Sequence, residues 1–450
     1  MNKLKQLWSN FRSSLWFVPV LMVIASAVLA LVFIEVDGRT NQELLAQYPR
    51  IFGAGADGSR GMLSSIAGSM ITVAGLTFSL TIVAMAQASS QYTSRILRNF
   101  MRDRSNQFVM GFFVGIFVYC LIVLRTIRGG DEGRFIPSLA VLFGLLLAIS
   151  SVGVLIFFIH HIASSIQASS IISSAAEETI GALQRLFADQ VSEELEAAEA
   201  QLSARLLEGK VWRPVPARRT GYVQDFDAEG LVTFSVECDC ILRIERGVGS
   251  FVVKDSPLVS LSATANGVQL DEATTERLND LFTIRHYRTI DRDVAFGIRQ
   301  IVDIALKALS PGVNDTTTAV VCIDYLGAIL AELAVRRIDP HFRSQDADVR
   351  VIARGATFES FVRGAFDQIR DVAADNTAIY LRLLNALATV AQRTTTTRRR
   401  TALASQVDLI SDEADRLLAS DYNLKRVRER VGAVRAILNQ TFVASTHVVK

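Results

Sequence analysis

Residues 61–94 contain no Asp, Glu, Lys or Arg, yet they are rich in hydroxyl groups and glycine. Small side chains recur there at helical spacing and would share one helix face. They are Ser65, Gly68, Ser69, Thr72, Gly75 and Ser79. Such a face suits close packing of membrane helices, with hydroxyls bonding across the contact, or a pore in which the hydroxyls of several subunits line a path for water. We take packing as the default, a pore as the sharper hypothesis and a ligand cleft as a third, and we expect the face to point away from lipid.

A second group of polar residues lies in the segment DVAFGIRQIVDIALKALSPGVNDTTTA. Arg299 and Asp303 have the four-residue spacing of ion pairs along a helix. Asn314 or Asp315 is placed to cap the helix that follows, because its side-chain oxygen accepts a first-turn N–H group. Alternatively, Asp303, Asn314 and Asp315 form an oxygen-rich cation site. We favour the structural roles and predict neither a metal site nor a cofactor.

Arginines follow the charge-free run and alternate with apolar residues. They are Arg95, Arg98, Arg102 and Arg104. This pattern suits an interfacial helix on anionic lipid, where each basic residue contributes roughly 1 kcal/mol, and the alternative is a loop that only sets topology. Further on, His160 and His161 are adjacent and diverge by about 100° on a helix, so we expect them to anchor the helix at the interface rather than bind a metal.

Composition and missing motifs limit the function classes. The net charge of +2, from 47 basic and 45 acidic residues, gives no reason to expect a nucleic-acid partner. The four cysteines have neither disulfide-framework nor zinc spacing. Phosphate-binding, dinucleotide, zinc-protease and nucleophile-elbow motifs are absent from the sequence. We therefore predict that the protein is not an enzyme.

Four stretches are apolar enough to cross a bilayer, which takes roughly 20 residues. They lie at about 15–35, 62–88, 106–125 and 137–161, so residues 1–162 are predicted to form a four-helix transmembrane domain. We interpret the first as a retained helix and not as a cleaved signal peptide. Lys and Arg outnumber acids before the first span and between the second and third, which predicts that both termini are cytoplasmic.

The remainder reads as three parts. Three- and four-residue apolar steps over 163–210 predict a stalk helix that continues the fourth span into the cytoplasm. The segments GYVQDF, CILRIE and GSFVVKDSPLVSL predict strands of a small β-rich module at 211–263, whereas LVTFSVECD is ambiguous between strand and helix. A helical domain is expected at 264–450, with later helices at about 356–392 and 400–440 and a solvated loop, TTTTRRR, between them.

Two stretches resemble a known family. GSMITVAGLTFSLTIVAMAQASSQYTSRILRNFMRDR and DVAFGIRQIVDIALKALSPGVNDTTTA are similar to the family called domain of unknown function 2254, predicted bacterial membrane proteins. Thr316 departs from the proline of that pattern, a change compatible with a helix start. The resemblance implies a bacterial inner-membrane location and carries no established activity.

The fold class that follows is a mainly α integral membrane protein with a cytoplasmic part. Because the small-residue face and the stalk both offer self-complementary surfaces, we expect a homo-oligomer in contact with anionic lipid. The leading functional hypothesis is a channel-like or transport-related protein with the second span as pore or core helix. The alternatives are a membrane-anchored sensor or scaffold, whose cytoplasmic domain binds a protein or small ligand, and, third, a membrane enzyme.

Overall fold

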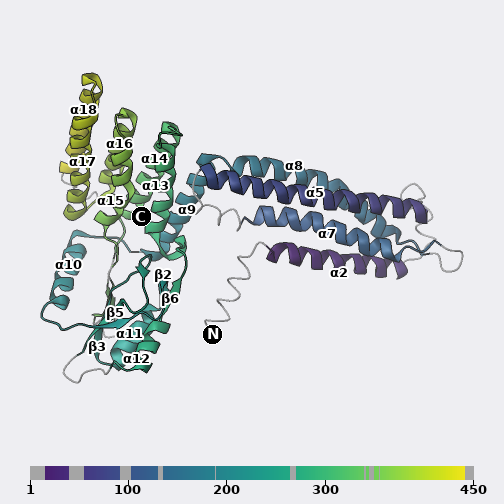
Figure 1. The fold of residues 1–450 in the computed structure, drawn as a ribbon, viewed down its shortest axis with the longest axis horizontal. Helices are drawn as coiled ribbons and strands as arrows, with labels where there is room; N and C mark the ends of the chain where they lie inside the picture. Colours follow the sequence, from purple (N-terminus) through teal and green to yellow (C-terminus); the bar gives the residue numbers. More distant parts are fainter. Residues whose placement is uncertain are drawn as a thin grey trace, which may run out of the picture. The chain divides into compact units, whose positions relative to one another are not determined.

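A computed structural model describes residues 16–39, 55–91, 103–129, 135–187, 189–263, 270–338, 341–343, 349–353 and 355–440. The chain is mainly helical and divides into two compact units, Met1–Ser170 and Ile171–Lys450, which are described separately (Figure 1).

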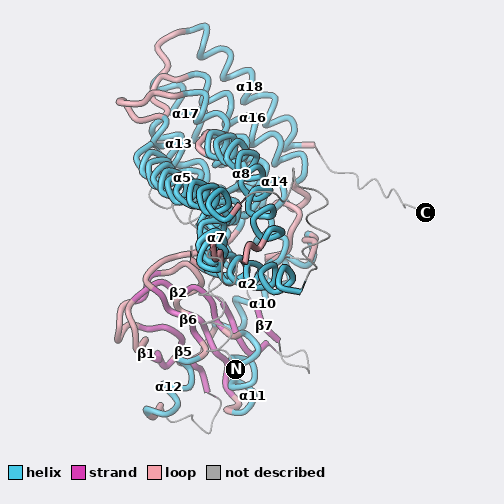
Figure 2. The backbone as a smooth tube through the Cα atoms, turned by 90° about the vertical axis from the view of Figure 1, so that its right-hand side faces the viewer, coloured by secondary structure: helices cyan, strands magenta, loops and turns pink. Residues whose placement is uncertain are grey.

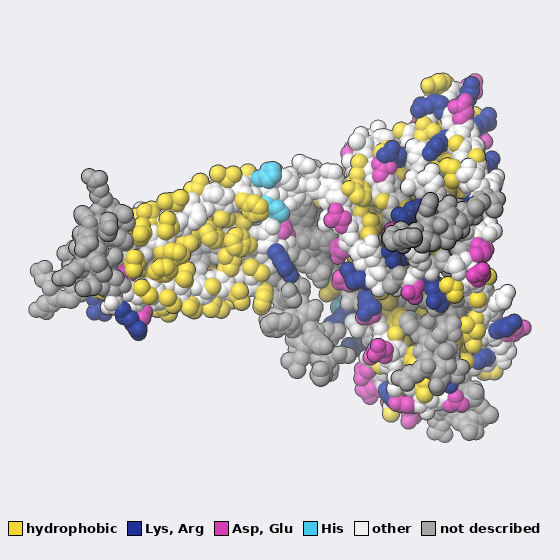
Figure 3. All heavy atoms as spheres, turned by 180° about the vertical axis from the view of Figure 1, so that it is seen from behind, with side chains coloured by type: hydrophobic (Ala, Val, Ile, Leu, Met, Phe, Trp, Pro, Cys, Tyr) yellow, Lys and Arg dark blue, Asp and Glu magenta, His cyan; other side chains and the backbone are white. Residues whose placement is uncertain are grey.

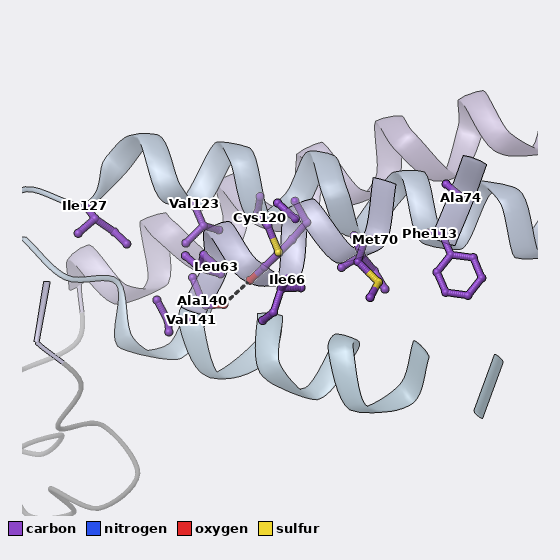
Figure 4. Close-up of a cluster of buried hydrophobic side chains, with 14 of the residues drawn as sticks. Leu63, Ile66, Met70, Ala74, Phe113, Cys120, Val123, Ile127, Ala140 and Val141 are labelled. Atoms are coloured by element: carbon purple, nitrogen blue, oxygen red, sulfur yellow. Dashed lines mark hydrogen bonds between the residues drawn. The ribbon is translucent and has the colours of Figure 1, made fainter. Parts of the chain in front are cut away.

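The first unit is a bundle of four long helices: α2 (Phe17–Arg39), α5 (Ala56–Gln91), α7 (Arg104–Thr126) and α8 (Ser138–Ser165). These helices occupy the stretches predicted from the sequence. Helix α7 lies centrally and contacts the other three. Figure 4 shows the apolar core, in which Leu63, Ile66 and Met70 of α5 lie with Phe113 of α7 and Ala140 of α8.

Two glycines of α7 allow α2 to pack closely. A Cβ atom added at Gly111 would lie 2.9 Å from Cα of Pro19, and one added at Gly115 would lie 2.5 Å from the Ser26 hydroxyl oxygen. Both distances are shorter than the contacts that Cβ atoms make in proteins, so glycine at these two positions permits the close approach of α2. Small residues commonly serve this role between membrane helices.

The start of α8 is capped by a residue from another helix. Its own N-cap residue, Pro137, makes no side-chain capping bond. Instead, the Asp37 carboxylate of α2 accepts hydrogen bonds from the backbone N–H groups of Leu139 at 3.0 Å and Ala140 at 2.9 Å. Asp37 is only 6% exposed. A carboxylate at this position also interacts favourably with the positive end of the helix dipole.

The predicted stalk helix is wrong as a single element. Helix α8 ends at Ser165, and two separate helices follow, α9 (Ala168–Leu186) and α10 (Glu193–Leu207). Between α9 and α10 the backbone leaves the helix to pair with a later segment, through bonds from Val191 N to Val335 O and from Arg337 N to Asp189 O. These bonds replace the intrahelical ones that a continuous stalk would make.

Within the described residues, eight strands form two sheets; Figure 2 draws the strands in magenta. The strands are β1 (Arg213–Pro216), β2 (Gly221–Phe226), β3 (Cys240–Ile244), β4 (Phe251–Val252), β5 (Pro257–Ala263), β6 (Phe282–Arg285), β7 (His341–Arg343) and β8 (Val349–Ala353). One sheet has the order β1-β5-β3-β8-β7 and the other β4-β2-β6. The predicted module is therefore incomplete, because β6, β7 and β8 come from the segment expected to be entirely helical.

The ambiguous segment LVTFSVECD lies mostly in a helix, α11 (Ala228–Glu237). Asp227 caps it by accepting a bond from Gly230 N at 3.0 Å. Its Leu231 and Phe234 pack into the same apolar core as Leu242 and Val259 of the larger sheet. Burial of these side chains against the sheet explains why the segment is helical.

The remaining helices are α12 (Glu272–Asp280), the 3-10 turn η1 (Ile290–Arg292), α13 (Val294–Ala308), α14 (Thr316–Leu333), α15 (Phe358–Val372), α16 (Thr377–Arg393), α17 (Thr397–Leu417) and α18 (Asp421–Asn439). The two long helices predicted near the C-terminus are wrong, since each region holds two. The first region breaks at Ala374, whose φ of +49° is left-handed, and Asn376 caps the new helix. Ser420 caps the last helix.

The predicted solvated loop TTTTRRR is also wrong. Its arginines lie in the first turn of α17, where Arg399 is 2% exposed. The Arg399 guanidinium donates to the carbonyl oxygens of Leu333 and Ala334, both at 3.1 Å, at the end of α14. Arg400 donates likewise to the Leu438 carbonyl at the end of α18, at 2.7 Å. Cations are favourable at helix C-termini, which carry the negative end of the dipole.

Five helices in the described residues are long and apolar enough to span a membrane. Four are the helices of the first unit, with mean hydropathies from 1.8 to 2.9, and the fifth is α14, with 1.4. Figure 3 shows hydrophobic side chains covering the visible face of the first unit, whereas charged side chains are spread over the second. The distribution in the first unit is the one that a bilayer requires.

Candidate functional site

The small-residue face of α5 points out of the bundle. All six of its residues are exposed in the single chain, and the opposite face of the helix supplies the core residues Leu63, Ile66, Met70 and Ala74. No atom lies within 4 Å of a Cβ added at Gly68 or Gly75, in contrast to the tightly enclosed glycines of α7. No described residue of this chain therefore packs closely on these two glycines.

The hydroxyl groups of α5 bond to their own helix on both faces. On the outer face, Thr72 Oγ1 donates to the Gly68 carbonyl oxygen at 2.8 Å. On the inner face, Thr77 and Thr81 donate to the carbonyls of Ala74 and Thr77, at 2.9 and 2.8 Å. Such bonds satisfy a hydroxyl in an apolar environment and leave its lone pairs available to a second donor.

Elsewhere the outward faces of the bundle carry mainly bulky apolar side chains, although α8 also exposes Ser150 and Gly153. Helix α2 exposes Leu21, Ile24 and Leu31, and α8 exposes Leu146 and Ile149. Side chains of this kind suit contact with acyl chains. Helix α5 also exposes bulky side chains such as Leu76 and Phe78, but it carries the longest row of exposed small and hydroxyl residues among the described bundle helices.

Of the four arginines predicted to face lipid, three lie outside the described residues: Arg95, Arg98 and Arg102. Arg104 begins α7 and is exposed. The preceding residue, Asp103, caps α7 through Ser105 N at 2.9 Å, and its other oxygen lies 2.6 Å from Nε2 of His161 in α8. Residue spacing does not predict this contact between the ends of two helices, because Asp103 and His161 are far apart in the chain.

The polar residues of the signature segment, which is DVAFGIRQIVDIALKALSPGVNDTTTA, take structural roles. Arg299 pairs with Asp303 at 2.7 Å, as the spacing predicts, and also donates to Gln368 Oε1 of α15 at 2.6 Å. Asp315 caps α14, which confirms one of the two predicted caps, by accepting bonds from Thr318 N and Oγ1. These bonds lower the pKa of Asp315, so its carboxylate stays ionised and its capping contribution is lost only at acidic pH.

Asn314 does not cap the helix. It is exposed and has a φ of +48°, which reverses the chain between α13 and α14. Since Asp303 and Asp315 are bonded elsewhere, the cation-site alternative is not assembled, and the described residues hold no group of three His, Cys, Asp or Glu side chains arranged for a metal. Thr316, the departure from the family pattern, accepts a bond from Asn376 Nδ2 at 2.8 Å, which links the starts of α14 and α16.

Gly297, within the same signature segment, allows another close approach. A Cβ atom at this position would clash with the side chain of Thr179 on α9, which is completely buried. The glycine therefore lets α9 pack directly on α13. Spacing alone did not single it out.

Comparison with known proteins agrees with these observations. The family model described as "Predicted membrane protein (DUF2254)" matches residues 12–389. The chain belongs to this family. Relatives from Mycobacterium tuberculosis and Mycobacterium bovis, each named as an uncharacterised protein, are 30% identical over 452 residues, covering 96% of this chain and 84% of theirs. No solved structure matches the chain.

Family membership and the apolar helices together show a multi-pass membrane protein. The two stretches that carried the resemblance correspond to different structural features. The first is α5 with its outward small-residue face, and the second is the pair α13 and α14 with its capped reversal. Packing and capping account for the polar residues of α13 and α14, so the outward face of α5 is the better candidate for function.

Proposed function

We propose that this family member forms a homo-oligomer in which the small-residue face of α5 borders a central passive pathway for small ions or polar solutes. The observation that carries the proposal is the exposure of six small or hydroxyl residues along one face of α5, next to outer faces that are mainly bulky and apolar. Because the subunit itself leaves Gly68 and Gly75 uncovered, this face is free to meet a second copy or water. Small residues allow helices of neighbouring subunits to pack closely, and hydroxyl groups can line a water-filled pore between them.

The distribution of charges favours a passive pathway. Asp, Glu, Lys and Arg residues lie only near the ends of the four bundle helices, as Arg60 of α5 and Arg125 of α7 illustrate. Coupled transporters usually place ionisable side chains at depth, where they bind and release the driving ion. A pore that conducts down a gradient needs no such group.

The proposed topology has four spans, α2, α5, α7 and α8, with α14 as a core helix of the second unit. Helix α14 carries Asp324 and Glu332, which pair with Arg382 and Arg336. It packs against α13 and α16, and its hydropathy is the lowest of the five. The excess of Lys and Arg before α2 and between α5 and α7 orients both termini toward the cytoplasm of a bacterial inner membrane.

Ion flux through reconstituted vesicles tests the proposal. The wild-type protein is expected to pass small ions under voltage, membrane tension or osmotic shock. Thr72→Leu, which fills the face with an apolar side chain, is expected to reduce this flux on the order of tenfold by making the path hydrophobic. Ile149→Leu, on the lipid-facing surface of α8, is the matched control and should conduct normally. Wild-type flux no greater than that of empty vesicles under all three stimuli would contradict the proposal.

A second candidate is a membrane-anchored sensor whose C-terminal unit binds a small ligand. One observation favours it, namely a row of aromatic and basic side chains on the outer face of the smaller sheet. Because the two functions reside in different units, a flux measurement and a binding measurement distinguish them.

A further inference from the structure

The smaller sheet, β4-β2-β6, has one apolar face buried in the core and an opposite face whose side chains are half-buried or exposed. Val223 and Val252 point inward and are each 1% exposed. On the opposite side, Tyr222 of β2 pairs directly with Phe251 of β4 and with Arg285 of β6. Directly paired residues project from the same face of an antiparallel sheet, so these three side chains form one row, the aromatic–arginine row.

The aromatic part of the row is available to a ligand. Phe251 is 50% exposed and meets Tyr222 edge to face, with ring centroids 5.0 Å apart. In this arrangement the edge of one ring is covered and a broad ring face stays open. Exposed aromatic rings on a sheet are platforms on which planar groups stack.

The basic part of the row lies at the other end. Arg285 makes no ion pair with any carboxylate in the described residues, whereas Asp225, a carboxylate on the same face, is already paired with Arg292 at 3.5 Å. Arg285 is half-buried, and a guanidinium without a carboxylate partner favours phosphate, which it binds through two parallel hydrogen bonds. The row therefore presents an apolar stacking surface and an anion-binding group together.

The dimensions of the row limit the size of the occupant. Neighbouring strands lie about 4.8 Å apart, so Phe251 and Arg285, two strands apart, are separated by roughly 10 Å. This separation matches a base joined through its sugar to phosphate. An inorganic anion would bind Arg285 without stacking on the rings, and a simple aromatic compound would stack on the rings without binding Arg285.

We propose that the aromatic–arginine row binds a nucleotide, with the base stacked on Phe251 and the phosphate held by Arg285. This proposal develops the second candidate function and does not depend on a pore. It identifies the class of ligand that the C-terminal unit would sense.

Equilibrium dialysis of the full-length protein in detergent micelles, with radiolabelled ATP and GTP as probes, tests this inference. Saturable binding of at least one probe is expected, at one molecule per chain. Phe251→Ala and Arg285→Gln should each weaken it by tenfold or more. The matched controls are Tyr422→Ala and Arg398→Gln, an exposed aromatic and an exposed arginine elsewhere in the unit, and both should bind as wild type does.

Competition shows which parts of the nucleotide are recognised. Adenosine alone and inorganic triphosphate alone should each compete more weakly than ATP, because each engages only one end of the row. Three results would overturn the proposal: no saturable binding of either probe, binding unaffected by both row variants, or competition by inorganic triphosphate equal to that of ATP. Because Phe251 and Arg285 lie on the face opposite the buried core, unchanged melting temperatures are expected and serve as the folding control.

Discussion

Replacing Arg399 by alanine is expected to lower the free energy of unfolding of the C-terminal unit by about 3–5 kcal/mol. The Arg399 guanidinium is buried among hydrogen-bond acceptors. It donates to Glu196 Oε1 of α10 at 3.1 Å and to two carbonyl oxygens that end α14, and it lies 5.1 Å from the ring of Phe358. Its removal leaves the half-buried Glu196 carboxylate without this cation and two helix carbonyls without this donor.

Thermal unfolding of the full-length protein in detergent checks this prediction, with a decrease in melting temperature of roughly 10 °C expected. Hydrogen exchange of peptides from α10, α14 and α17 should show that these helices lose protection together. Arg398→Ala is the matched control, since Arg398 is the exposed neighbour in the same helix turn, and its effect should stay within about 0.5 kcal/mol. If both variants melt at the same temperature, Arg399 does not hold these helices together.

Asp37→Ala is expected to destabilise the membrane bundle by about 2–4 kcal/mol. The loss exceeds that of an ordinary helix cap because the freed N–H groups of Leu139 and Ala140 belong to a helix in an apolar environment, where water cannot replace the carboxylate. Asp37→Asn should lose only part of this stability, because its amide oxygen still accepts one of the two bonds.

Unfolding of purified protein in mixed micelles with increasing sodium dodecyl sulfate measures this effect. Glu35→Ala is the control, since Glu35 is an exposed carboxylate near the same end of α2 and pairs only with Arg39 of its own helix in the described contacts. We expect Glu35→Ala to be the most stable of the three variants, Asp37→Asn to be intermediate and Asp37→Ala to be the least stable. Equal stability of Asp37→Ala and Glu35→Ala would show that the cap from α2 does not hold α8.

Local signals account for the parts of the fold that the sequence predicted well. The helices α2, α5, α7 and α8 follow from charge-free runs, since the apolar membrane interior requires long uninterrupted stretches. Strands β2 and β3 follow from dense β-branched and aromatic residues between turns, and the cap at Asp315 follows from its place before a helix. In each case the deciding residues are close in sequence.

The errors arise where distant segments decide the local structure. The stalk breaks because residues 189–191 pair with the chain around Val335, and β8 joins the larger sheet through parallel pairing with β3. One missed site did carry a local signal. Three arginines in the first turn of α17 oppose the dipole of their own helix, and two of them, Arg399 and Arg400, bind carbonyl oxygens at the ends of other helices. Periodicity also identified the small-residue face of α5 but not what lies against it.

The most direct test of the central claim is the environment of this face in a lipid bilayer. A spin label is attached at Thr72→Cys in a Cys238→Ser background, because Cys238 is the one native cysteine that is not buried. The label reports its accessibility to oxygen, which concentrates in lipid, and to a nickel chelate, which stays in water. Ile149→Cys provides the lipid-facing reference. We expect much lower oxygen accessibility at residue 72 than at residue 149. Equally high oxygen accessibility at both positions would place the face of α5 in lipid and contradict both the assembly and the pathway.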